Sequence, residues 1–139
     1  MNHAYMYAAM IAAGLLSTMN VWVDKIEDIR WSLNDVYMTV LMTGWMALFM
    51  GLYNRDIKMI FIGSVVTIAM LVCIRTQVGI DQGQYINGMI PHHSMAVHMS
   101  KKVLEQNITP GLRVLANKII LSQNVEIGIL KKINHEKNM

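Results

Sequence analysis

Charged residues are scarce in this sequence, because Asp, Glu, Lys and Arg make up only 15% of its 139 residues, against about 25% in typical soluble domains. Hydrophobic residues make up 54%, a balance that argues against a disordered chain and against an ordinary soluble domain. The two prolines exclude a proline-rich linker, and the single cysteine, Cys73, excludes an internal disulfide. The net charge of +3 is too small to indicate a nucleic-acid partner.

Three stretches of the chain contain no Asp, Glu, Lys or Arg: residues 1–23, 36–53 and 59–74. A helix needs about 20 mostly apolar residues to cross the hydrocarbon core of a bilayer. The third stretch is short, but Lys58 and Arg75 flank it and can extend their charged ends to the interface. We therefore predict a transmembrane domain over residues 1–76, with helices at about 4–23, 35–53 and 59–75.

The orientation of these helices is only weakly encoded. The short loop from Asn54 to Lys58 carries two cations in five residues, and short basic loops favour the cytoplasmic side. The first stretch lacks a basic amino-terminal region, so we interpret it as a retained helix rather than a cleaved signal. We expect an integral membrane protein, of a bacterial inner membrane, with its C-terminal domain on the extracytoplasmic side.

The C-terminal part of the sequence indicates a helical hairpin. Residues 77–84 are predicted to form a linker and residues 85–139 a hairpin domain, because the apolar spacing from Tyr85 onward alternates between three and four. Thr109 is suited to cap a second helix and Pro110 to begin it. The predicted inner seam of the first helix is Tyr85, Met89, His92, Ala96, Met99 and Val103, and that of the second is Leu112, Ala116, Ile119, Gln123, Glu126, Leu130 and Ile133.

Two polar residues interrupt the apolar seam of the second helix. In an antiparallel hairpin that turns near residue 109, the numbers of facing residues sum to roughly 217. His92 is then expected opposite Val125 and Glu126, and Met95 opposite Ser122 and Gln123. Because a buried carboxylate without a partner is costly, a metal ion or a histidine is expected beside Glu126.

The first helix of the hairpin carries three histidines and three methionines between Met89 and Met99. Imidazole binds copper, zinc, iron and nickel, whereas thioether selects Cu(I), so the mixture favours copper, as Cu(I) or Cu(II), over other transition metals. The ordinary alternative is a methionine-rich core with histidines on its surface. The predicted metal-binding residues are His92, His93, Met89, Met95, Met99, His98, Glu126 and Gln123.

The chain from Asp81 to about Ile133 resembles the domain of unknown function 305 family. The shared pattern is an acid, an aromatic residue and M-I-P-H-H-x-x-A-x-x-M, followed by L-A-x-x-I-x-x-x-Q-x-x-E-I. The matching residues are Asp81, Tyr85, Met89-Ile90-Pro91-His92-His93, Ala96, Met99, Leu115-Ala116, Ile119, Gln123 and Glu126-Ile127. The resemblance implies a ferritin-like helical domain and a role in copper binding and metal resistance outside the cytoplasm. Leu130 departs from the family, which commonly has a methionine there.

A hairpin of about 55 residues buries little apolar surface by itself. It is expected to pair with a second hairpin in a homodimer or a higher homo-oligomer, forming a four-helix bundle, or else to pack on the membrane domain. The expected fold is therefore all-α: three transmembrane helices followed by a ferritin-like hairpin domain.

The leading functional prediction is a non-enzymatic, membrane-anchored protein that captures or buffers copper. An alternative is an oligomeric Cu(I) transporter, because Met38, Met42, Met46 and Met50 recur every four residues in the second membrane helix. A di-metal oxidase is weakly supported, since the hairpin seam offers only one carboxylate, that of Glu126. The amino-terminal Met1-Asn2-His3 could chelate Cu(II) if its amine is free.

Overall fold

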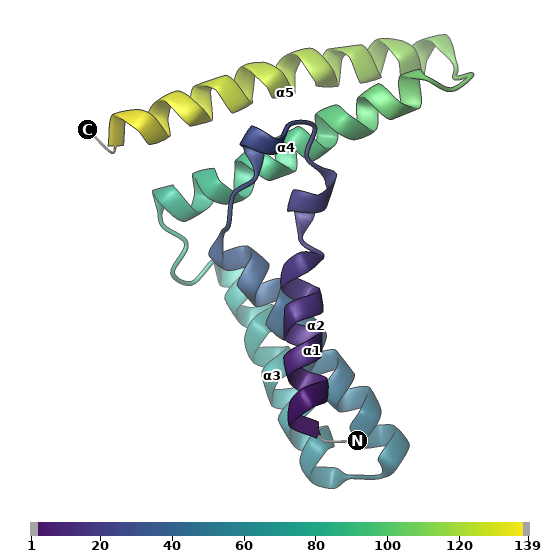
Figure 1. Cartoon of the computed structure of the whole chain (residues 1–139), viewed down its shortest axis with the longest axis vertical. Coiled ribbons are helices and arrows are strands. Elements are labelled where there is room, and N and C mark those ends of the chain that lie inside the picture. The colour runs from purple at the N-terminus through teal and green to yellow at the C-terminus, as the bar shows by residue number, and fades with distance from the viewer. Residues whose placement is uncertain (1–2, 138–139) are drawn as a thin grey trace. The chain divides into compact units, whose positions relative to one another are not determined.

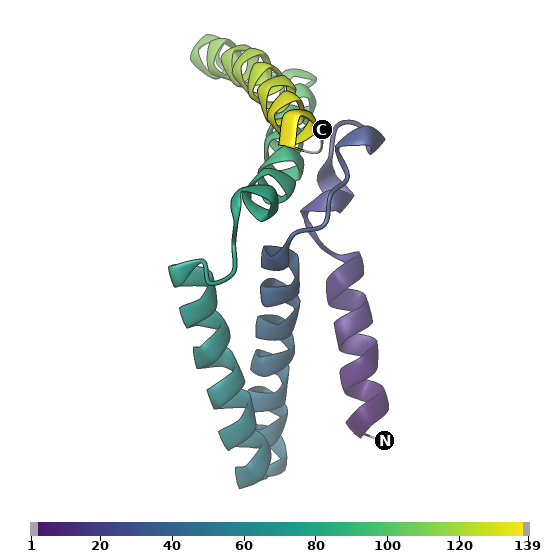
Figure 2. The ribbon, with the colours of Figure 1, turned by 90° about the vertical axis from the view of Figure 1, so that its left-hand side faces the viewer.

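The computed structural model describes residues 3–137, and all regular secondary structure in this range is helical. The described residues form two compact units. One contains residues 3–18 and 33–80, and the other contains residues 19–32 and 81–137. Figures 1 and 2 show the helices of each unit from two directions.

The first unit contains three apolar helices: α1 (His3–Leu16), α2 (Leu33–Asn54) and α3 (Ile57–Thr76). Three segments are long and apolar enough to cross a membrane, namely Ala4–Trp22, Leu33–Asn54 and Ile57–Thr76. The prediction of three such helices is therefore confirmed. The first segment differs from the predicted continuous helix, because α1 ends at Leu16 and a short 3₁₀ helix, η1 (Met19–Trp22), follows it.

Helices α2 and α3 lie side by side as an antiparallel pair (Figures 1 and 2). Their turn is set by Asp56, whose carboxylate accepts hydrogen bonds from the backbone N–H groups of Lys58 and Met59 at the start of α3. A β-carbon on Gly63 of α3 would meet the backbone of Leu48 in α2. The absence of a side chain at residue 63 therefore permits the close approach of the two helices.

The four methionines that recur along α2 are only partly buried. Met38 and Met42 are exposed, while Met46 and Met50 are half-buried. A β-carbon on Gly14 would meet Cε of Met42, so this methionine packs against α1. The amino-terminal Met1-Asn2-His3 lies outside the residues whose side chains the structure describes.

The second unit is built on a hairpin of α4 (Gln82–Leu104) and α5 (Pro110–Lys137), which run antiparallel (Figure 1). Helix α4 begins three residues before the predicted start, because the Asp81 carboxylate accepts a hydrogen bond from the backbone N–H of Gln84 and caps it. Helix α5 begins at Pro110, as predicted. In its first turn, the backbone N–H of Leu112 donates a long hydrogen bond of 3.4 Å to the hydroxyl of Thr109, which caps the helix. The hairpin core contains Ile86, Ile90 and Ile127, with Leu130 and Ile133 packed against them.

Residues 19–32 connect α1 to α2 in the sequence, but they pack on α4. This connecting segment contains η1 and a second 3₁₀ helix, η2 (Ile26–Asp28). Its two ends are joined by Asn20, whose side chain exchanges two hydrogen bonds with the backbone of Arg30. The compact units thus have other boundaries than the predicted domains, in which residues 1–76 form a single transmembrane domain.

Candidate metal centre

A pocket of about 200 Å³ lies between α4 and α5, within the second unit. From α4 it receives Tyr85, Met89 and His93, which are spaced four residues apart and so lie along one face of the helix. From α5 it receives Glu126, Ile129 and Leu130. The pocket therefore brings a thioether, an imidazole and a carboxylate together in otherwise apolar walls.

The shortest polar contact across this pocket joins His93 to Glu126. Nδ1 of His93 lies 3.0 Å from Oε2 of Glu126. The His93 residue is only 7% exposed, whereas the Glu126 side chain is half-exposed. Although the distance is that of an ion pair, the buried Nδ1 atom does not meet the angular requirements of a hydrogen bond to any described group. The imidazole nitrogen thus lies beside the carboxylate without an aligned hydrogen bond among the described residues, so a further partner could use it.

The predicted register of the hairpin is nearly right, but the predicted face of α4 is wrong. The residue numbers of the contacting pair, His93 and Glu126, sum to 219, close to the expected 217. His92, which was expected opposite Glu126, is exposed on another side of α4, and Met99 is also exposed. The residues of α4 that are buried instead are Ile86, Ile90, Pro91, His93, Ser94, Val97 and Ser100.

The structure brings only some of the eight predicted metal-binding residues together in the pocket. Three of them, Met89, His93 and Glu126, line the pocket. Gln123 is half-buried one turn before Glu126, outside the pocket lining. The remaining four lie elsewhere on α4: His92 and Met99 are exposed, and Met95 and His98 are half-buried. His92 stays next to the pocket through its ring, which meets the ring of His93 edge-on with centroids 5.9 Å apart.

The pocket gathers three side chains of kinds that can bind a metal ion. Its donors are one thioether and one imidazole, with a carboxylate at the rim. Within residues 3–137, no group of three or more His, Cys, Asp and Glu side chains lies close enough to hold a metal ion. Leu130, where the resembled family commonly has a methionine, also lines the pocket.

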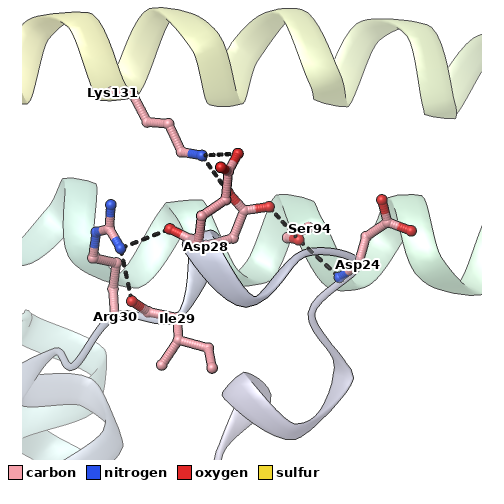
Figure 3. Close-up of polar contacts among 7 residues, drawn as sticks. Asp24, Asp28, Ile29, Arg30, Ser94 and Lys131 are labelled. Carbon is pink, nitrogen blue, oxygen red and sulfur yellow. Dashed lines mark hydrogen bonds and ion pairs between the residues drawn. The ribbon is translucent and has the colours of Figure 1, made fainter.

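A second group of polar residues, which the sequence did not reveal, holds α4 and α5 beside this pocket. Asp28 of the connecting segment has a side chain that is only 3% exposed. Its Oδ2 accepts a 2.7 Å hydrogen bond from the hydroxyl of Ser94, and its Oδ1 lies 2.6 Å from Nζ of Lys131 (Figure 3). Because Ser94 follows His93 and Lys131 follows Leu130, Asp28 links the two walls of the pocket.

Neighbouring residues extend this network. Lys131 also contacts the exposed carboxylate of Glu27 at 3.0 Å. The Asp24 N–H donates to the Ser94 hydroxyl, and the Asp24 carboxylate pairs with Lys101 at 2.7 Å. Burial lowers the pKa of Lys131, but its hydrogen bonds to Asp28 and Glu27 outweigh burial, so the pKa is raised above 10.5. No local signal in the sequence indicates this arrangement, because Asp24 and Asp28 have the appearance of ordinary loop charges.

Comparison with known proteins agrees with the resemblance seen in the hairpin. The family model described as "Domain of unknown function (DUF305)" matches residues 76–138. A relative from Acanthamoeba polyphaga mimivirus, named "Uncharacterized protein L153", is 42% identical over 142 residues, which cover 96% of this chain and 91% of the relative. No solved structure matches the chain. The chain therefore belongs to one family with the mimivirus relative over nearly its whole length, and its residues 76–138 match the DUF305 family model.

Proposed function

We propose that this protein is anchored in a membrane by its three apolar helices and captures or buffers copper through its C-terminal hairpin. The observation that carries the proposal is the pocket between α4 and α5, where Met89, His93 and Glu126 converge. A dry helix–helix seam would have an aliphatic residue in place of buried His93, because burying a polar side chain costs free energy.

Copper is the metal that these donors favour. Met89 offers a thioether, which is a ligand for Cu(I), and His93 offers an imidazole, which binds both copper oxidation states. Glu126 lies at the rim, where it would supply an oxygen ligand to Cu(II) or orient the imidazole through the 3.0 Å contact. Another transition metal with a preference for imidazole is a second possibility.

The proposal also includes the histidine and methionine side chains of α4 that lie outside the pocket. His92 and Met99 lie outside the pocket on the exposed side of the helix. We propose that they take part in metal capture at the surface, with Met95 and His98 beside them, and pass the ion to His93 through the neighbouring ring of His92.

Self-association is part of the proposed function, since the hairpin leaves apolar side chains exposed along α5. A second copy would cover these residues in a ferritin-like four-helix bundle. The exposed apolar residues of α5 are Leu112, Val114, Leu115, Leu121, Val125 and Ile129. We further propose that the membrane is a bacterial inner membrane and that the hairpin lies on its extracytoplasmic side.

The experiment that tests this proposal is a copper titration of the detergent-purified full chain, followed by element analysis. The proposal predicts that the double variant His92→Ala, His93→Ala loses its copper, and that His93→Ala alone loses the tightest-bound ion. His135→Ala is the matched control, because His135 is an exposed histidine on α5 that does not line the pocket. Unchanged copper stoichiometry in the double variant would contradict the proposal.

A gain-of-function variant complements these losses. Leu130 lines the pocket, so Leu130→Met would add a second thioether beside Met89. The proposal predicts tighter binding of Cu(I) by this variant and little change in the binding of Cu(II), because thioether prefers the reduced ion. An equal change for both ions would indicate that residue 130 does not reach the metal.

Transport of Cu(I) along the methionine series of α2 stays an alternative prediction. It requires flux through reconstituted vesicles that stops when Met42 and Met46 are both replaced by leucine. Because these methionines lie in the first compact unit, the same double replacement would leave copper binding by the hairpin intact.

A further inference from the structure

The connecting segment, residues 19–32, combines buried polar groups with exposed apolar side chains. Its polar face, as we use the term, consists of buried Asp28 and Ser32 and the largely buried carboxylate of Asp24. Its apolar face consists of the exposed residues Val21, Trp22, Ile26, Ile29 and Trp31, of which Ile26 is 85% exposed, Trp22 56% and Trp31 53%. The charged residues Lys25 and Glu27, on either side of Ile26, are exposed as well.

The polar face of this segment is fixed in place by the hairpin. Asp28 is bound by Ser94 and Lys131, and Asp24 is bound by Lys101 and by the Ser94 hydroxyl. Turning the apolar residues inward would therefore break contacts to two helices. The apolar face must be covered by something outside the second unit, or remain in water.

Remaining in water would be unfavourable for so many large apolar side chains in 14 residues. Both ends of the segment continue into segments able to cross a membrane. The candidate span Ala4–Trp22 overlaps its beginning, and the candidate span Leu33–Asn54 starts directly after Ser32. Tryptophan favours the membrane–water interface, where one end of its ring is apolar and the other is wet.

We propose that the apolar face of residues 19–32 is a membrane-contact surface that inserts into the interfacial region of the lipid bilayer. Trp22 and Trp31 anchor the two ends, and Ile26 reaches into the acyl boundary between them. Because Asp28 ties the same segment to α4 and α5, this contact holds the hairpin at the bilayer surface. The inference rests on the membrane anchoring in the proposed function, but it is independent of metal binding and concerns a different surface.

Depth-dependent fluorescence quenching tests this inference on the full chain. Three single-tryptophan variants retain Trp22, Trp31 or Trp45 and replace the other two tryptophans by phenylalanine. Each is reconstituted in phosphatidylcholine vesicles that carry bromine at a shallow or a deep position of the acyl chain. Trp45 is the internal reference, because it is exposed near the middle of α2 and is expected to respond most to the deep bromine.

The expected result is that Trp22 and Trp31 are quenched most by the shallow bromine and little by aqueous iodide. Strong quenching of Trp31 by iodide, without quenching by either lipid, would overturn the proposal. Protection from both iodide and bromine would also overturn it, because a second copy of the chain rather than lipid would then cover the face.

A labelling experiment examines the centre of the segment without tryptophan. Ile26→Cys and Asn124→Cys are each made in a Cys73→Ser background, with Asn124 as an exposed control on α5. In vesicles, a charged maleimide should modify the Ile26→Cys variant at least tenfold more slowly than the control. Equal rates would show that residue 26 lies in water and would overturn the proposal.

Discussion

Replacing Asp28 by alanine should open the connecting segment far more often than replacing its neighbour Glu27. The two carboxylates contact the same Lys131 ammonium, at 2.6 Å and 3.0 Å. They differ in exposure, because the Asp28 side chain is 3% exposed and that of Glu27 is 65% exposed. The pair of variants therefore isolates the effect of burial on an otherwise similar contact.

The expected cost follows from the contacts that each variant removes. Asp28→Ala loses a hydrogen bond from Ser94 to a charged acceptor, about 1.5–3 kcal/mol, and leaves Lys131 with Glu27 as its remaining partner. Breaking a fully buried ion pair costs about 3–5 kcal/mol, but Lys131 is partly exposed, so we expect about 2–3 kcal/mol in total. Glu27→Ala removes an exposed ion pair, which contributes at most about 1 kcal/mol.

Amide hydrogen exchange of the full chain in detergent measures this difference locally. The reporting amides are those of Asp24, bonded to the Ser94 hydroxyl, and of Asp28 and Ile29, bonded within the segment. The expected costs correspond to exchange that is roughly 30- to 160-fold faster in Asp28→Ala and at most about fivefold faster in Glu27→Ala. Equal acceleration in the two variants would refute the reasoning that buried Asp28 holds the segment on the hairpin.

Three further predictions concern helix ends, helix packing and pH. The pKa of Lys131 is raised above 10.5. Its contribution to stability should therefore be complete below pH 10.5 and lost as the pH rises through its folded-state pKa. In an alkaline unfolding titration, Lys131→Met should lack this loss of stability. Gly63→Ala should lower the Tm in detergent by forcing α2 and α3 apart, whereas Gly128→Ala, with open space around it, should stabilise α5 by up to about 1 kcal/mol. Asp81→Ala should destabilise the first turn of α4 by about 0.5–2 kcal/mol, measured by hydrogen exchange at its first amides.

Local patterns in the sequence were sufficient to predict the main helices of the fold, but not the end of α1 at Leu16 or the 3₁₀ helices η1 and η2. Uncharged stretches predict the three apolar helices, and Thr109-Pro110 predicts the start of α5, because these signals depend only on neighbouring residues. The antiparallel register follows from the position of that turn. The residue numbers of the observed pair, His93 and Glu126, sum to a value within two of the predicted one.

The face of α4 could not be predicted in the same way. In a simple hairpin, α4 would have α5 as its single partner, and the three-four spacing then predicts that His92 and Met99 lie in the seam. In the structure α4 contacts both α5 and the connecting segment. Small polar residues such as Ser94 are therefore buried, while His92 and Met99 are exposed.

The connecting segment was missed because its role depends on distant partners. Asp28 is buried only through Ser94 and Lys131, which lie 66 and 103 residues further along the chain. No local pattern distinguishes such an acid from a solvated loop charge. Tertiary contacts thus decide which of the charged residues between α1 and α2 help to shape the pocket.

X-ray absorption spectroscopy of the copper-loaded full chain tests the central claim most directly, because it detects the sulfur and nitrogen neighbours of the metal. For the tightest-bound Cu(I), at no more than one ion per chain, the account predicts a sulfur neighbour that disappears in Met89→Leu, whose thioether lines the pocket, and persists in Met99→Leu, whose thioether is exposed. Loss of the sulfur signal in Met99→Leu with its retention in Met89→Leu would contradict the assignment of copper to the pocket between α4 and α5.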